Sequence, residues 1–160
     1  MKFGDTNTLI IGYGNTLRND DGVGYRLAER IATLSLLGLE VLASHQLTPD
    51  LAEAIAKVNL VIFADASADT SLKQVTVKNL GVEMVEFSSS HSCHPSYLLQ
   101  LAKTLYGYSP KAYWLMLPCA DFGLGETLSA KARQSQRDAF TIIQYLLLEH
   151  NFKVSKRLNN

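Results

Sequence analysis

The sequence predicts an α/β fold in which a mostly parallel, twisted sheet carries helices on both faces, giving three layers. Short β-rich runs alternate with longer helical patterns along the chain, the order typical of strand–helix–strand units. With 160 residues, of which 47% are hydrophobic, the chain is long enough to bury one substantial core. We therefore expect a single domain over residues 1–150, followed by a frayed tail over residues 151–160 that has little apolar content.

The first strand and the first helix are expected on either side of a glycine-rich loop. Thr8 to Tyr13 is a short apolar run that ends in Gly-Tyr-Gly-Asn, which favours a strand buried on both faces and stopped by a turn. Apolar residues then recur at helical spacing and mark one buried helix face: Val23, Leu27, Ile31 and Leu34.

The next three elements repeat this alternation. Leu39 to Ala43 is expected to form a second strand, and Leu60 to Ala66 a third, strongly apolar one. Between them, Pro49 to Lys57 is expected to form a short helix, because proline is favoured in the first turn.

The second half of the chain continues with weaker strands and two longer helices. Val75 to Val77 and Val82 to Phe87 are weak strand candidates, whereas Ala112 to Leu117 resembles a core strand. Pro95 to Tyr106 is expected to be helical. From Ser129 onward we expect a long helix, whose apolar face carries Ala139, Phe140, Ile143, Leu146 and Leu147.

Charge and composition argue against several classes of function. The 15 basic and 15 acidic residues leave no positive excess for nucleic acid or an anionic membrane surface. Met1 to Asn7 lacks the cationic start of a signal peptide and the following apolar run is too short to span a bilayer, so we expect a cytoplasmic protein. Cys93 and Cys119 fit neither a disulfide framework nor a four-thiolate zinc site, and we expect them to be reduced and packed.

Ionisable residues cluster in three loops: Asp20 with Asp21, Asp65, and His91 with His94. In a doubly wound sheet, the loops that follow core strands line the crevice where ligands bind. Residues far apart in the sequence are therefore expected to converge there.

The loop from Gly12 to Gly24 contains half of a dinucleotide-binding fingerprint, because Gly-x-Gly follows the first strand. Leu17 stands where that fingerprint needs its third glycine, and two aspartates at the helix start would repel a pyrophosphate. For Asp20 and Asp21, the simplest role is N-capping of the helix. One cap needs only one aspartate, so the second is a candidate oxygen ligand or water-orienting base.

Asp65 follows five apolar residues at the end of the third strand. Burying an unpaired carboxylate is costly, so Asp65 needs a partner, a metal or solvent, unless it forms an ordinary loop or capping hydrogen bond. His91 and His94 can ligate a transition metal, although a polar loop before a helix also explains them. Imidazole together with carboxylates suits zinc, nickel or iron.

These residues resemble one family, the [NiFe]-hydrogenase maturation endopeptidases. Its members open with a strand, Gly-x-Gly-Asn-x-Leu, a few residues, Asp-Asp or Asp-Glu and then Gly-x-Gly, and Gly12 to Gly24 matches this pattern throughout. The likeness extends to Val61 to Ala66 and to Ser90-His91 ahead of Tyr97-Leu98-Leu99, and it covers Thr8 to Leu147.

The resemblance implies an α/β endopeptidase, a hydrolase that removes the C-terminal extension of a nickel-loaded [NiFe]-hydrogenase large-subunit precursor. It implies that Asp21, Asp65 and His91 form the catalytic, metal-binding site. His91 has the family's spacing to the following helix, which leaves His94 as an alternative ligand or a neighbour that supports one. The nickel is expected to come with the substrate, and the isolated enzyme is expected to hold no tightly bound metal.

The loop from Ser44 to Asp50 departs from the family, many members of which carry Asp-Gly-Gly-Thr there. This His-Gln-Leu-x-Pro version, together with Phe122 to Ser129, resembles the branch that serves bidirectional, NAD(P)-linked hydrogenases. The sequence lacks the usual motifs of serine, zinc and cysteine peptidases. Two alternatives remain open: a zinc-dependent hydrolase of small amides, and a nickel chaperone that cleaves nothing.

Overall fold

The computed structural model describes residues 7–81 and 93–158, with side chains described as far as residue 150. Its five strands form one sheet in the order β2-β1-β3-β5-β4, and β4 alone among the paired strands runs antiparallel to its neighbour. The strands are β1 (Thr8–Tyr13), β2 (Leu39–Ser44), β3 (Leu60–Ser67), β4 (Thr76–Leu80) and β5 (Lys111–Pro118).

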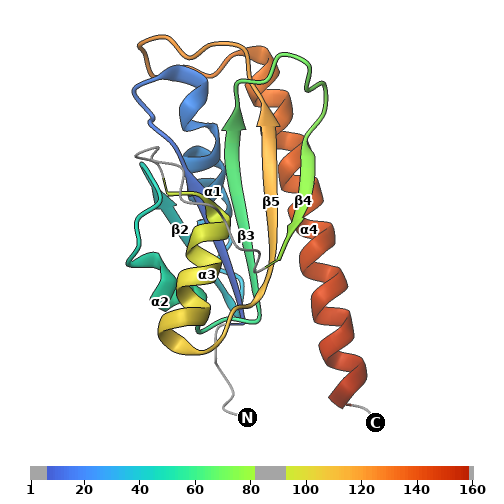
Figure 1. Ribbon diagram of the computed structural model, residues 1–160. Helices are drawn as coiled ribbons and strands as arrows, with labels where there is room; N and C mark the ends of the chain where they lie inside the picture. Colours follow the sequence, from blue (N-terminus) through green and yellow to red (C-terminus); the bar gives the residue numbers. More distant parts are fainter. Residues whose placement is uncertain (1–6, 82–92, 159–160) are drawn as a thin grey trace.

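Helices cover both faces of this sheet, which confirms the predicted three-layer α/β fold (Figure 1). They are a short 3₁₀ turn η1 (Asn19–Gly22), α1 (Val23–Ala32), α2 (Leu51–Ile55), α3 (Pro95–Tyr106) and α4 (Ala130–Leu158). The helices α1 and α4 pack on one face, and α2 and α3 pack on the other.

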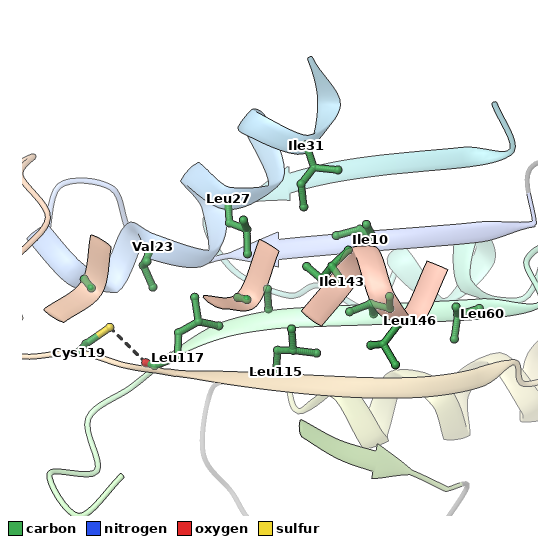
Figure 2. Packing of buried hydrophobic residues seen from close by; sticks show 14 residues of the cluster. Ile10, Val23, Leu27, Ile31, Leu60, Leu115, Leu117, Cys119, Ile143 and Leu146 are labelled. Atoms are coloured by element: carbon green, nitrogen blue, oxygen red, sulfur yellow. Dashed lines mark hydrogen bonds between the residues drawn. The ribbon is translucent and has the colours of Figure 1, made fainter. Parts of the chain in front are cut away.

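The core divides into two clusters, one on each face of the sheet. Alternate residues of a strand enter opposite clusters: Ile10 joins the cluster under α1 and α4, whereas Leu9 and Ile11 join the one under α2 and α3. Figure 2 shows the first cluster, to which Leu27 of α1 and Ile143 of α4 both belong. Burial on both faces explains why β1 and β3 appear in the sequence as continuous apolar runs.

The connections change direction at the middle of the sheet. From β1 the chain passes through α1 to β2 on one side, and from β2 it returns through α2 to β3 on the other side of β1. The carboxyl ends of β1 and β3 therefore flank a topological switch point, the usual ligand position in open α/β sheets. Tyr13 is the last residue of β1, and Asp65 lies near the end of β3.

Several boundaries differ from the sequence prediction. α1 ends at Ala32, so Leu34 lies beyond it with 47% of its surface exposed, and Ser35 leaves the helical region with φ +47°. The predicted helix from Pro49 is shorter, because α2 begins only at Leu51. The expected strand Val82 to Phe87 lies outside the described residues.

The last helix is longer than expected. α4 continues to Leu158, through most of the segment for which the sequence predicts a frayed tail. No glycine or proline occurs between Ala130 and Leu158 to stop it. Among the helices of residues 7–81 and 93–158, none combines the length and the hydropathy that crossing a membrane requires.

Candidate active site

The glycines of the Gly12 to Gly24 loop bring α1 directly onto the sheet. A side chain at Gly24 would collide with the carbonyl oxygens of Ala64 on β3 and Tyr13 on β1. One at Gly12 would collide with the carbonyl oxygen of Gly24. Helix α1 therefore starts in contact with both strands at the switch point, and the residues just before it lie beside the strand ends.

Asp65 has the partner that its burial demands, and this partner is Tyr13. The register pairs Gly12 with Ala64, so the next residues, Tyr13 and Asp65, are neighbours across β1 and β3. The Tyr13 hydroxyl donates a hydrogen bond to Asp65 Oδ2 at 3.0 Å.

Burial raises the pKa of Asp65 to about 6. The hydrogen bond from Tyr13 opposes this rise, and the negative charge of Asp21 adds to it. Burial, and then the charge of Asp65, raise the pKa of Tyr13 far above its usual value, so its hydroxyl remains a donor.

Asp21 is held at the same place by the loop that precedes it. Its Oδ2 accepts a hydrogen bond of 2.7 Å from the backbone N–H of Asn15. Gly14 has φ +142°, and a side chain there would collide with the carbonyl oxygen of Asp21, so the turn requires glycine. The effect of Asp21 on the pKa of Asp65 shows that the two carboxylates share one electrostatic environment. The structure thus brings together two of the three predicted site residues.

His91, the third predicted site residue, lies outside the described residues. Cys93, two positions further on, is described, is half-buried and acts electrostatically on Tyr13. His94 is the N-cap of α3, because its Nδ1 accepts a hydrogen bond of 3.1 Å from the backbone N–H of Ser96. Capping therefore explains the histidine that the sequence leaves as an alternative ligand.

The surroundings of His94 favour the neutral imidazole. Its ring lies edge-on to Trp114 at 4.9 Å between centroids. Burial, and then the charge of Lys78, lower the pKa of His94 below its usual value.

Asp20 does not cap α1, and the N-cap interpretation is wrong for it. The N-cap of α1 is Gly22, which receives no capping hydrogen bond from a side chain. Asp20 is instead fully buried, and its Oδ2 accepts hydrogen bonds from Ala120 N at 2.8 Å, Asp121 N at 2.9 Å and Ser129 Oγ at 2.6 Å. Its Oδ1 accepts a fourth, from Ser129 N at 2.7 Å.

These hydrogen bonds decide the charge state of Asp20. Burial alone would raise the pKa of the carboxyl group, but the donors from Ser129, Ala120 and Asp121 outweigh it and lower the pKa below its usual value. Asp20 is therefore ionised at neutral pH and anchors the loop before α4.

Asn19 ties the same two loops together. Its Nδ2 donates to Asp121 Oδ2 at 3.0 Å, and its Oδ1 accepts from Thr127 N at 3.2 Å. The backbones also pair, since Gly125 N donates to the carbonyl oxygen of Leu17 at 2.9 Å. Residues 15–22 and 120–129 therefore form one unit, which contains Asp21.

Cys119 is a packed thiol, as expected, and a poor nucleophile. It is 4% exposed, and its Sγ donates to the carbonyl oxygens of Leu117 at 3.3 Å and Asp20 at 3.7 Å. Burial, and then the charge of Asp20, raise the pKa of this thiol to about 12. A thiolate at neutral pH is therefore disfavoured, which argues against cysteine chemistry at this position.

The chemistry available at the switch point is that of two close carboxylates. Within residues 7–81 and 93–158, no three His, Cys, Asp or Glu side chains form a metal-binding group. Asp21 and Asp65 are two carboxylates that interact electrostatically at this position. A carboxyl group with a pKa of about 6 can also take up or release a proton near neutral pH. The pair thus suits cation binding, proton transfer, or both.

Comparison with known proteins adds the fold relationship. No family model and no curated protein matches the sequence. Among solved structures, the [NiFe] hydrogenase maturation protease HycI from Thermococcus kodakarensis superposes with a TM-score of 0.71 at 22% identity, over 89% of this chain and 92% of that one. The hydrogenase maturating endopeptidase HybD from E. coli gives 0.67 at 19% identity, over 90% and 93%. The hydrogenase 2 maturation peptidase from a Thaumarchaeota archaeon gives 0.66 at 18% identity, over 88% and 97%. At these identities the likeness establishes that this chain has the fold of those proteins over most of its length.

Proposed function

We propose that this chain is a cytoplasmic endopeptidase that removes the C-terminal extension of a nickel-loaded [NiFe]-hydrogenase large-subunit precursor. The observation that carries the proposal is the pairing of Asp21 with Asp65 at the topological switch point. The fold shared with hydrogenase maturation proteases and the match of Gly12 to Gly24 to that family's opening motif support the same conclusion.

In this proposal, Asp21, Asp65 and His91 bind the nickel that the substrate already carries. The donor set fits such a cation, because two carboxylates that repel each other at a partly buried site are stabilised by a positive charge between them. The substrate's own ligands supply the rest of the coordination. The isolated enzyme then needs no tightly bound metal, and the presence of nickel tells the enzyme that the precursor is mature.

The two carboxylates differ in what they offer to the reaction. Asp21 Oδ2 is fixed by Asn15 N, which suits an immobile ligand. Asp65 has a pKa of about 6 without a cation, and a cation bound beside it would lower that pKa and keep the carboxylate ionised as a ligand. The substrate's nickel would supply Lewis acidity towards the scissile carbonyl.

We also propose that the chain belongs to the branch that serves bidirectional, NAD(P)-linked hydrogenases, because the two segments that resemble this branch lie in loops near the site. The distinctive segment Phe122 to Ser129 belongs to the loop that Asp20 and Asn19 anchor beside Asp21. The other distinctive segment, Ser44 to Asp50, follows β2, and the ring of its His45 stacks on Tyr25 of α1 at 5.2 Å. Both segments follow strands whose carboxyl ends lie at the edge of the sheet that carries the site.

The test is incubation of the purified protein with nickel-loaded and nickel-free precursor, read by intact mass. We expect the loaded precursor alone to lose a C-terminal peptide. The variant Asp138→Asn, which alters an exposed aspartate of α4, should cleave like the wild type. Binding of the loaded precursor without any loss of mass would refute the peptidase and favour a nickel chaperone. Cleavage of nickel-free precursor by a protein that holds stoichiometric zinc would favour a zinc hydrolase.

A further inference from the structure

We propose that Tyr13 is a positioning residue of this site: its hydroxyl holds Asp65 Oδ2, so that Asp65 presents its other oxygen, Oδ1, to the substrate's nickel. The inference rests on the proposed function and adds to it a residue that neither the motif nor the metal-ligand set contains. Its starting observation is the 3.0 Å hydrogen bond from Tyr13 to Asp65.

Both ends of this hydrogen bond lie on rigid elements. Tyr13 and Asp65 belong to adjacent parallel strands and come directly after the last pair of the register, Gly12 with Ala64, which places them side by side. Gly24 of α1 packs directly on the backbone of both strands. A ligand held between two core strands keeps its orientation better than one held in a loop.

The hydrogen bond also has a fixed direction. An ionised carboxylate only accepts, so the Tyr13 hydroxyl must donate to Asp65. The indole N–H of Trp114 lies close enough to this hydroxyl to affect the pKa of Tyr13, although among the described residues Trp114 Nε1 is buried and completes no hydrogen bond.

This arrangement matters for a metal ligand because a free carboxylate can rotate and bind through either oxygen. The Tyr13 hydroxyl engages Oδ2 and the backbone N–H of Ala66 is a second donor to the carboxylate, so Asp65 is held in one orientation. Groups that hydrogen-bond to a metal ligand in this way typically change metal affinity or activity by about 10-fold to 100-fold when they are removed.

The test replaces Tyr13→Phe, which removes the hydroxyl and keeps the ring. The matched control is Tyr113→Phe, because Tyr113 is also a partly buried strand tyrosine but packs against the α1 and α4 cluster on the opposite face. Trp114 is the only tryptophan of the sequence, so its fluorescence reports on this site directly. Two measurements are made on each protein: quenching of Trp114 fluorescence by Ni²⁺ added to the isolated enzyme, and kcat/KM with nickel-loaded precursor.

We expect Tyr13→Phe to weaken Ni²⁺ binding and to lower kcat/KM by about 10-fold or more, while its melting temperature stays close to that of the wild type. The control Tyr113→Phe should match the wild type in both Ni²⁺ affinity and kcat/KM. In the Asp65→Asn background, Tyr13→Phe should change the Ni²⁺ affinity no further, because its effect acts through Asp65. A purely structural role would lower the melting temperature and would leave the Ni²⁺ affinity of the folded protein unchanged.

Two failures are distinguishable. If wild type and Tyr113→Phe cleave the precursor and Tyr13→Phe matches them in Ni²⁺ affinity and kcat/KM, the inference is overturned and the peptidase proposal stands. If the wild-type protein leaves the loaded precursor intact, the proposed function fails and this inference fails with it.

Discussion

The hydroxyl of Ser129 donates a 2.6 Å hydrogen bond to the buried carboxylate of Asp20, from a position 109 residues further along the chain. Ser129 in turn accepts from the backbone N–H of Ala132, so it caps α4 while it binds Asp20. The pair joins the loop that carries Asp21 to the loop that starts α4. The position of Asp21 therefore depends on a segment that is remote in the sequence.

Replacing Asp20→Asn should destabilise the protein by about 1 to 3 kcal/mol, because an amide cannot accept at both oxygen positions. In either orientation, its NH₂ group would face a backbone N–H donor, from Ser129 or from Ala120 and Asp121. Urea unfolding measures the loss, with Asp138→Asn as the control. An unchanged midpoint would mean that the buried network contributes little to stability.

The buried carboxyl of Asp65 should make the free energy of unfolding fall as the pH rises from the pKa of Asp65 in the unfolded chain to its pKa in the folded protein. Its pKa is about 6 in the folded protein, against 3.8 for an aspartate that is fully exposed to water, so the folded state binds this proton more tightly. Raising the pH removes the proton, and above about pH 6 the full cost of the buried charge is present. Asp65→Asn should therefore be more stable than wild type at pH 8, by at most about 3 kcal/mol. Below about pH 4 the difference should vanish, and thermal unfolding across this range tests it. Equal stability at pH 8 would show that burial of the carboxylate carries no cost.

Much of the fold followed from apolar runs and local stop signals. The bounds of β1 were predicted because an uninterrupted apolar run ends at Gly14, and those of α3 because Pro95 starts it and Gly107 ends it with φ +74°. The end of α1 was missed, since Leu34 continues the helical spacing although the backbone has already turned. Strand order depends on which side each crossover takes, and local sequence does not encode this.

The site was predictable only in part, because local sequence does not show which distant residues meet in the fold. Asp65 stood out because a charge directly after an apolar strand needs a partner. Tyr13 was not recognised as that partner, since it stands inside a glycine motif and its contact depends on the pairing of β1 with β3. A hydroxyl at the end of the neighbouring strand was the available signal. Asp20 was assigned to capping because its partners, Ala120 and Ser129, lie 100 and 109 residues away.

Asp21→Asn should abolish cleavage of the nickel-loaded precursor while the fold survives. The amide oxygen of asparagine can still accept from Asn15 N, so the loop keeps its turn, but the charge needed for the cation is lost. The pKa of Asp65 should fall in this variant, because the charge of Asp21 raises it in wild type. Carboxyl ¹³C chemical shifts followed against pH measure that change. Normal cleavage by the Asp21→Asn variant would show that Asp21 is not a site residue.

Substitutions of the two histidines before α3 should have different effects: one should lower stability and the other should lower cleavage. His94 caps α3, so His94→Ala should lower the free energy of unfolding by about 1 kcal/mol, while most of the cleavage activity remains. His94→Asn should restore the stability, since asparagine is a favoured N-cap. His91→Ala should show the opposite pattern, because the proposed role of His91 is to bind the nickel of the loaded precursor. Its unfolding curve should match wild type, and its cleavage rate should fall below detection. If His94→Ala proves inactive with normal stability and His91→Ala cleaves normally, the ligand is His94, and capping is only a secondary role of that side chain.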